Sequence, residues 1–200
     1  MTLKISSFAR IDTGGAFKNG ELVVPNHQEG QDDFLLHIYK ALGIKYGKFH
    51  KMDPLCKLAF LTAELLTDKG EILKDVPPED IFIVIGNSSS SILSDTAHQQ
   101  EIDMPSPAVF VYTLPNIMLG ELCIKYKIMG ENTCFQSEGY DINFIDEYIE
   151  STFKDTGYSH CIFGWVNADH NNLSAHLFLV SKSDDGMHFT PEKIRSLMNI

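Results

Sequence analysis

The sequence feature that most constrains the fold is an uninterrupted apolar run, Ile81 to Gly86, which reads IFIVIG. Its β-branched residues favour a β-strand, and the lack of alternating polar residues indicates a strand that is buried on both faces. A strand of this kind lies inside a sheet that other elements cover on both sides. The run therefore predicts an α/β layered domain.

Segments with strand and helix periodicity surround this run. Further strands are predicted at residues 3–11, 133–137, 160–166 and 173–180. Helices are predicted at residues 32–43, 53–70, 115–127 and 141–154, with a short one that begins at Thr190-Pro191. Residues 13–30 are rich in Gly, Asn and Pro and predict a loop. We therefore expect a single domain over residues 1–200, in which helices cover both faces of a mixed sheet of about five strands.

Two local signals are the clearest. Asp53 is a good N-cap and Pro54 suits the first turn of a helix, so a helix is expected to begin there. The polar segment Asn167 to Asn172 separates the last two predicted strands, which indicates a hairpin.

Length and charge exclude several classes of protein. The 200 residues allow one domain with a sizeable core, or two small ones. The formal net charge of −11 argues against a protein that binds the phosphate backbone of nucleic acids, because such a protein needs a basic face. No apolar run reaches the ~18 residues of a transmembrane helix, and the first residues lack the apolar core of a signal peptide. We expect a cytoplasmic protein.

The cysteine and histidine patterns predict neither a metal nor a cofactor. No two of the four cysteines form a Cys-x-x-Cys pair, and each lies among apolar residues, so packing in the core is expected. Asp169, His170 and His176 flank the predicted hairpin turn but lack the compact spacing of metal ligands. Roles in the turn and on a strand face are expected instead.

The segment from Pro105 to Ala168 carries an ordered series of short motifs. Pro115-Asn116 begins a helix, the turn Gly130-Glu131-Asn132 follows it, and a short strand then leads into another helix. This series resembles the core of the β-ketoacyl synthases, the condensing enzymes of fatty-acid and polyketide assembly. The resemblance implies the thiolase fold of those enzymes.

Further motifs extend the resemblance to residues 45–180. Lys51-Met52-Asp53-Pro54 precedes a helix rich in Ala and Leu, IFIVIG precedes Asn87 and four serines, and Phe163-Gly164-Trp165 lies near the family's Gly-Gly pair. The synthases have two similar halves, and the second half supplies the histidines or lysine that activate the malonyl unit. The motifs here match only the first half, so the resemblance implies the N-terminal half of the thiolase fold.

Gly139 stands where the resemblance places the nucleophile. In the synthases a cysteine follows the strand at a helix start, and aligning the turn at Gly130 with the family's turn puts Gly139 in that place. Glycine has no side chain to acylate. The resemblance therefore implies a non-catalytic partner or scaffold in acyl-chain assembly, comparable to the chain-length-factor subunits that pair with a competent synthase. The chain is most similar to the short members encoded with aryl-polyene or flexirubin-type pigment pathways.

Two neighbouring residues are weaker candidates for a nucleophile. Cys134 lies five residues before Gly139, an odd offset that puts side chains on opposite faces of a strand, and it is away from the helix start that would lower a thiol pKa. Ser137 is nearer but needs a neighbouring base, so we expect it to cap the helix. For Gly139 itself we expect a tight turn with positive φ, which glycine adopts at little cost. No catalytic residue is predicted.

Two polar groups have simpler interpretations than a site. Ser88 to Ser91 offer hydroxyls to an anion at a helix start, but the lysine of a P-loop is lacking, so a polar loop is expected. The acidic residues Glu147, Glu150 and Asp155 fall on the solvent face of the helix at 141–154, and we do not expect a pair of acid–base carboxylates.

The resemblance also implies how the chain associates. In the synthases the strand before the nucleophile pairs antiparallel with its mate across a two-fold axis. The corresponding interface residues here are Thr133, Cys134, Phe135, Gln136 and Ser137. A homodimer or a heterodimer with a complete ketoacyl synthase is expected, and an acyl carrier protein is a further candidate partner. Two alternatives stay open: an acyl- or thioester-binding hydrolase that reuses the cleft, and a self-associating structural protein unrelated to acyl chemistry.

Overall fold

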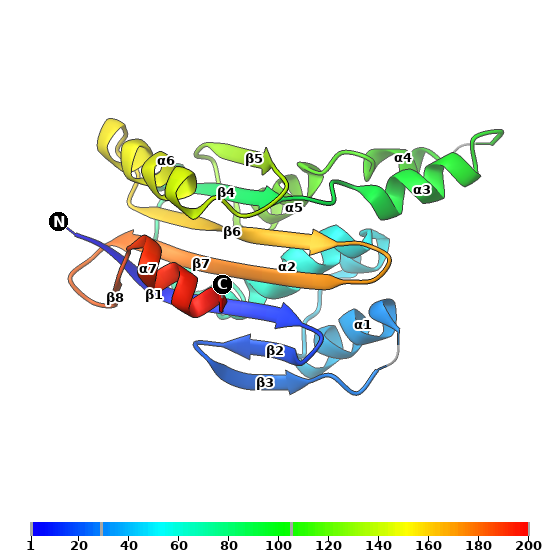
Figure 1. Cartoon of the computed structure of the whole chain (residues 1–200), viewed down its shortest axis with the longest axis horizontal. Coiled ribbons are helices and arrows are strands. Elements are labelled where there is room, and N and C mark those ends of the chain that lie inside the picture. The colour runs from blue at the N-terminus through cyan, green and yellow to red at the C-terminus, as the bar shows by residue number, and fades with distance from the viewer. Residues whose placement is uncertain (1, 29, 105, 200) are drawn as a thin grey trace.

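The computed structural model describes residues 2–28, 30–104 and 106–199, and Figure 1 shows their arrangement. Within these ranges eight strands form one mixed sheet in the order β3-β2-β1-β7-β6-β4-β5, and β8 pairs with β1. The strands are β1 Leu3–Asp12, β2 Gly15–Lys18, β3 Glu21–Pro25, β4 Ile81–Asn87, β5 Asn132–Gln136, β6 His160–Ala168, β7 Leu173–Lys182 and β8 Met187–His188. Pro105, where the segment that resembles the synthases begins, lies outside the described residues.

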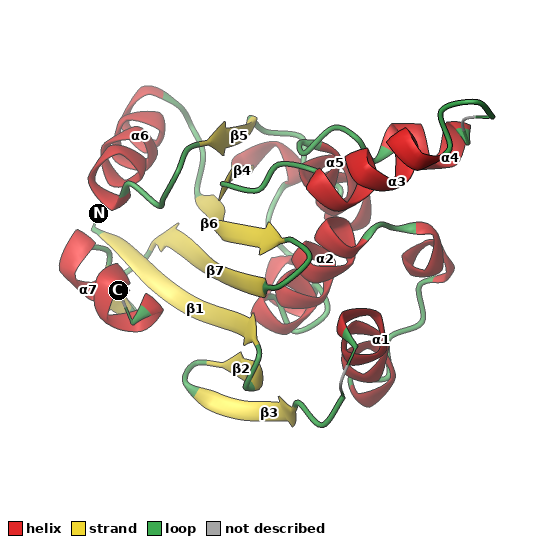
Figure 2. Cartoon of the chain, turned by 45° about the vertical axis from the view of Figure 1, so that its right-hand side comes forward, coloured by secondary structure: helices red, strands yellow, loops and turns green. Residues whose placement is uncertain are grey.

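Helices cover both faces of the sheet, as the sequence predicts. The α-helices are α1 Gln31–Ala41, α2 Pro54–Leu66, α3 Ile92–Gln100, α4 Pro107–Val111, α5 Ile117–Tyr126, α6 Ile142–Asp155 and α7 Pro191–Met198. Short 3-10 helices span Gly47–Lys51, Glu71–Leu73 and Pro78–Asp80. Figure 2 shows α6 and α7 on one face and α1, α2 and α5 on the other, and a hydrophobic core lies under each set. In the described part of the chain, no helix is long and apolar enough to cross a membrane.

The strand predicted from the IFIVIG run is confirmed. Every residue of β4 is buried, and β4 lies between β5 and β6, both of which run parallel to it. The predicted hairpin is also confirmed, because β6 and β7 are antiparallel and Ala168 faces Leu173 across the turn. The mixed α/β architecture follows from these two features, since parallel strands need covered faces and connecting helices.

The prediction of a loop over residues 13–30 is wrong for half of that segment. It forms β2 and β3, an antiparallel pair that extends the sheet beyond β1, so the expected number of about five strands is too low. Asn19 and Gly20, at the turn between the two strands, both adopt positive φ, which these residue types tolerate best. The Gly and Asn residues of this segment do form a turn, as expected. The strands on either side of it are only four and five residues long, so their pattern was missed. Helices α3 and α4 were also not anticipated.

Candidate functional site

The parallel strands β4, β5 and β6 end at the same edge of the sheet, where sites in α/β proteins commonly lie. Asn87 closes β4, Gln136 closes β5, and the loop that follows β5 carries Gly139 to the start of α6. The candidate nucleophiles and the serine loop all lie at or next to this edge. The geometry of each can therefore be compared with its predicted role.

Gly139 is exposed and lies in the loop between β5 and α6. Its φ is outside the positive range, contrary to our expectation, and a Cβ built on it would meet no heavy atom within 4 Å. The backbone here is open enough that any L-residue fits without strain. Neither the turn nor the packing requires glycine at this position, and sterics do not account for the lack of a side chain.

Ser137 does not cap α6. Its hydroxyl donates a 2.7 Å hydrogen bond to the carbonyl oxygen of Gly139, and the N-cap is Asp141, whose Oδ1 accepts from the backbone N–H of Phe144. The expectation failed because an aspartate that immediately precedes the helix is at least as good a cap as a serine four residues earlier. In the part of the chain that the structure describes, the Ser137 hydroxyl contacts no acid–base side chain, so nothing activates it as a nucleophile.

Cys134 packs toward the core under α2 and α5, while its neighbour Phe135 packs toward α6 on the other face. Burial raises the pKa of the Cys134 thiol to about 11, so the thiol stays protonated near neutral pH. Cys56 and Cys161 are fully buried, and Cys123 is half-buried against the same core as Cys134. The predicted core positions of the cysteines are confirmed for these residues.

The serine loop, Ser88 to Ser91, is hydrogen-bonded to other segments of the same chain. Asn167 Oδ1, at the end of β6, accepts from the backbone N–H groups of Ser88 and Ser89 at 2.8 and 3.4 Å, and Asn167 Nδ2 donates to Ser88 Oγ. Ser91 Oγ donates a 2.8 Å bond to the carbonyl oxygen of Thr113. These contacts occupy the backbone donors of Ser88 and Ser89 and the hydroxyl of Ser91, which supports the interpretation as a polar loop. Beneath it the buried Asn87 donates to the carbonyl oxygen of Val166.

A cluster beside Gly139 was not foreseen from the sequence. Tyr140 is edge-on to Trp165, with ring centroids 5.5 Å apart. Within the described ranges, the buried Tyr140 hydroxyl and Asp146 Oδ1 have no hydrogen-bond partner. Burial, then the charges of Glu150, Glu192 and Glu147, raise the pKa of Asp146 to about 6. The sequence signal for this cluster is weak: Asp146 lies on a helix that is rich in acidic residues. That helix packs against α7, whose first turn also carries an acidic residue.

β5 is the edge strand of the sheet, and its outer side has no strand partner among the described residues. Thr133 Oγ1 lies 3.1 Å from Tyr148 Oη, and Phe135 is edge-on to Phe144 and Tyr148 at 5.0 and 5.1 Å. Three exposed apolar side chains lie on segments next to this strand: Ile124 on α5, Met129 in the turn before β5 and Phe144 on α6. The predicted segment 133–137 thus lies at an edge with unpaired backbone groups and apolar surroundings.

A hollow of about 440 Å³ lies elsewhere, between the first turns of α1, α2, α3 and α4. Its apolar lining includes Met52, Leu93 and Val109, and Ser94 Oγ donates to Asp53 Oδ2 at 2.9 Å. The candidate nucleophiles do not line this hollow. The geometry therefore gives no support to the alternative of a hydrolase that reuses a cleft.

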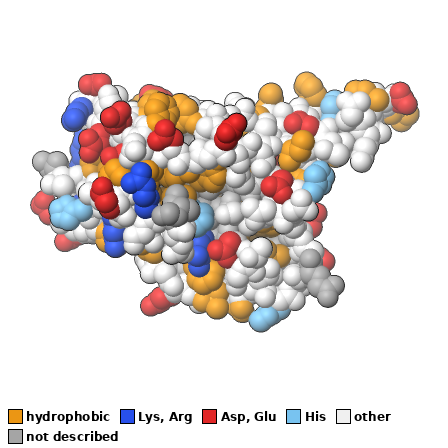
Figure 3. Space-filling model, in the orientation of Figure 1, with side chains coloured by type: hydrophobic (Ala, Val, Ile, Leu, Met, Phe, Trp, Pro, Cys, Tyr) orange, Lys and Arg blue, Asp and Glu red, His pale blue; other side chains and the backbone are white. Residues whose placement is uncertain are grey.

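The remaining polar candidates have structural roles. Asp169 Oδ1 accepts from the backbone N–H groups of Asn171 and Asn172 in the hairpin turn. His176 lies half-buried on β7 opposite Arg10, and burial, followed by the charge of Arg10, lowers its pKa to about 4. No group of three metal-ligating side chains occurs within the described residues. Figure 3 shows acidic side chains on the surface of the molecule, and the three acidic residues assigned to the solvent face of α6, Glu147, Glu150 and Asp155, are exposed.

Comparisons with known proteins identify the fold. No protein-family model matches the chain, and no curated protein matches its sequence. A solved structure of the ishigamide ketosynthase/chain length factor matches with a TM-score of 0.64 and 13% identity, covering 94% of this chain and 64% of that chain. A ketosynthase (ApeO) in complex with its chain length factor (ApeC) from Xenorhabdus doucetiae matches with a TM-score of 0.63 and 13% identity, covering 100% of this chain and 91% of that chain.

A third match is AntDE:AntF, a type II PKS acyl-carrier protein in complex with its ketosynthase, with a TM-score of 0.62 and 11% identity over 90% of this chain and 62% of that chain. The chain therefore has the thiolase-like fold of ketosynthases and chain length factors, as the sequence resemblance implies. It spans 64% and 62% of the matched chains in two of these structures, and 91% in the other.

Proposed function

We propose that this chain is a non-catalytic partner of a ketosynthase in the assembly of acyl chains. The observation that carries the proposal is Gly139, an exposed glycine in the loop between the edge strand β5 and α6, in a fold shared with ketosynthases and chain length factors. Neither the backbone conformation nor the packing requires glycine at this position, so we infer that a side chain once stood here and was lost. A protein without the nucleophile contributes to the pathway through association.

The surface around β5 supports association as the mechanism. The outer edge of β5 offers backbone donors and acceptors, and each costs free energy when it is buried without a partner. Antiparallel pairing with the same strand of a second subunit satisfies these groups across a two-fold axis. Apolar side chains near the strand, such as Met129 at 75% exposure and Phe144 at 47%, then leave water.

The cysteines support a non-catalytic role. The thiol of Cys134 has its pKa raised to about 11 by burial, and the pKa of Cys123 is also raised by burial. Thiolate is the form that attacks a thioester, so neither residue is a substitute for a cysteine at position 139.

Two measurements test the proposal. The purified chain is mixed with a complete ketosynthase from the same genome and with an acyl carrier protein, and complexes are detected by size-exclusion chromatography with light scattering. A complex with the ketosynthase is expected, and binding of the carrier protein to that complex separates acyl assembly from purely structural self-association. The chain is also incubated with an acyl thioester and its intact mass is measured. A stoichiometric adduct that disappears in Cys134→Ala would contradict the proposal.

A further inference from the structure

A hollow of about 430 Å³ lies at the end of the parallel strands opposite to Gly139, beside the segment that leads into β4. It is formed by the turn after α2, the 3-10 helix Glu71–Leu73 and the end of α5. Four lysines line it, Lys69, Lys74, Lys125 and Lys127, together with apolar groups of Leu73 and Tyr126. So many lysines in one hollow are notable in a chain whose formal net charge is −11.

Two of these lysines are paired and two are not. Lys125 Nζ lies 3.4 Å from Glu64 Oε1, and Lys74 Nζ lies 3.1 Å from Glu71 Oε2. A third nearby carboxylate, Asp68, is in an ion pair with Lys18 of β2. Lys69 and Lys127 are exposed and form no ion pair with the described residues. Within the described residues, neither of these two ammonium groups therefore has a carboxylate at ion-pair distance.

Both unpaired lysines occupy backbone positions that favour glycine. Lys69 has φ of 60° in the turn after α2, and Lys127 has φ of 58° at the end of α5. In this left-handed conformation an L-residue with a Cβ is strained, and glycine is the usual choice past a helix end. Lysine is not a residue type that this conformation favours. Two such lysines on one hollow indicate that the side chains serve a purpose other than forming the turns.

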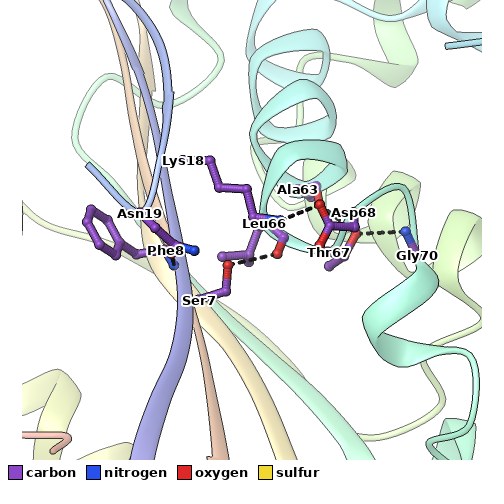
Figure 4. Close-up of polar contacts among 9 residues, drawn as sticks. All are labelled: Ser7, Phe8, Lys18, Asn19, Ala63, Leu66, Thr67, Asp68 and Gly70. Carbon is purple, nitrogen blue, oxygen red and sulfur yellow. Dashed lines mark hydrogen bonds and ion pairs between the residues drawn. The ribbon is translucent and has the colours of Figure 1, made fainter. Parts of the chain in front are cut away.

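Capping of α2 is not that purpose, because other groups already bond its last carbonyl oxygens. Thr67 Oγ1 donates to the Ala63 carbonyl oxygen at 2.7 Å, and Ser7 Oγ on β1 donates to the Leu66 carbonyl oxygen at 3.0 Å (Figure 4). The Gly70 N–H is bonded in turn to Thr67 Oγ1 at 3.0 Å. The last carbonyl oxygens of α2 are thus bonded without the ammonium of Lys69 or of Lys127.

We propose that this hollow binds a phosphate monoester of a small organic molecule. A phosphate monoester is close to a dianion at neutral pH, because its second pKa is about 6, and two unpaired ammonium groups match that charge. Lysine binds phosphate as a mobile point charge, which suits two side chains at the rim. The apolar groups of Leu73, Val76 and Tyr126 suit the carbon part of the ligand. This inference is independent of the proposed function and concerns the other end of the strands.

The double variant Lys69→Gly/Lys127→Gly tests the site without harming the fold. Glycine relieves both left-handed positions, so the variant is expected to keep or raise the melting temperature. Binding is measured by isothermal titration calorimetry with phenyl phosphate, adenosine monophosphate and inorganic phosphate. Phenyl phosphate or adenosine monophosphate is expected to bind the natural chain, with the dissociation constant raised about tenfold or more in the variant and also raised when salt increases from about 50 to about 300 mM.

The control variant Lys40→Ala/Lys45→Ala removes the same charge from exposed lysines outside the hollow and is expected to leave the affinity unchanged. Three results would overturn the proposal: no binding of any of the three phosphates, an unchanged affinity in the double glycine variant, or an equal loss of affinity in the control. Equal affinities for inorganic phosphate and for both esters would refute the organic part of the ligand. The two esters together distinguish a simple apolar body from a nucleotide.

Discussion

Gly86 on β4 lies directly opposite Trp165 on β6, and the indole ring occupies the space that a Cβ on Gly86 would need. Tyr140 packs edge-on against the same indole with a centroid separation of 5.5 Å. The buried strand and the loop that carries Gly139 are therefore joined through one aromatic side chain. This relationship links the packing of the sheet to the position of the candidate site.

Gly86→Ala is expected to destabilise the fold. The methyl group would force Trp165 to move within a close-packed interior, which typically costs about 1–3 kcal/mol. For a chain of this size that corresponds to a fall in melting temperature of roughly 2–12 °C, measurable by circular dichroism. Gly157→Ala is the matched control, since a Cβ there would meet nothing within 4 Å. An unchanged melting temperature for Gly86→Ala would show that the indole is free to move aside.

Gly139→Cys is expected to fold normally and to carry the most reactive thiol of the chain. A side chain at position 139 meets no atom within 4 Å and the position is exposed, so a thiol there is open to water and to a reagent. Burial raises the pKa of Cys56, Cys123, Cys134 and Cys161, so the native thiols react slowly. Brief treatment with iodoacetamide near neutral pH should add one group by intact mass, and none to the natural chain. Labelling of a native cysteine first would contradict this geometry.

Asp146→Asn is expected to stabilise the protein at neutral pH. The pKa of Asp146 is raised from 3.8 to about 6, so the folded protein holds a proton that the unfolded chain releases between these values. Asp146 therefore adds stability as the pH falls through this window, and above about pH 6 its desolvated charge is unfavourable. Asparagine lacks that charge. The urea midpoint of the variant should exceed that of the natural chain near pH 7.5 and approach it near pH 4.

Other acidic groups titrate in the same range, so the comparison needs a control. Glu147→Gln changes an exposed neighbour on the same helix and should shift the urea midpoint little at either pH. Identical pH dependence of the midpoint in Asp146→Asn and in the natural chain would exclude a role for Asp146.

Elements with continuous patterns were predictable from the sequence. β4 is apolar at nearly every position, so its composition predicts a buried strand. α2 has an aspartate N-cap followed by a proline, and its apolar face agrees with this start, so both signals predict the same helix. β2 and β3 were missed because they have four and five residues, and their turn residues resemble those of a loop. The cap of α6 was misassigned because two good capping residues precede the helix and only geometry chooses between them.

The sites depend more strongly on tertiary packing. The lysine-lined hollow joins residues 69–78 and 125–127, which the packing of α2 against α5 brings together. No local pattern in either segment indicates that the two segments come together. Nor does a local pattern indicate that two of the four lysines there form no ion pair. Likewise the φ of Gly139 is set by the path from β5 to α6, and no residue type near it determines that path.

Phe135→Asp is expected to weaken association through β5. Phe135 is half-buried beside Phe144 and Tyr148 on the edge strand, and a charge there would have to lose its hydration when a second subunit covers the edge. We expect the dissociation constant, for a homodimer or for the complex with a ketosynthase, to rise about tenfold or more by analytical ultracentrifugation.

Because Phe135 also packs within the chain, Met129→Asp provides a second variant at an exposed position near the same edge. Leu22→Asp on β3, at the opposite edge and 53% exposed, is the control and should leave association unchanged. A protein that stays monomeric at high concentration and ignores the ketosynthase, or one that Leu22→Asp weakens as much as Phe135→Asp does, would exclude β5 as the interface.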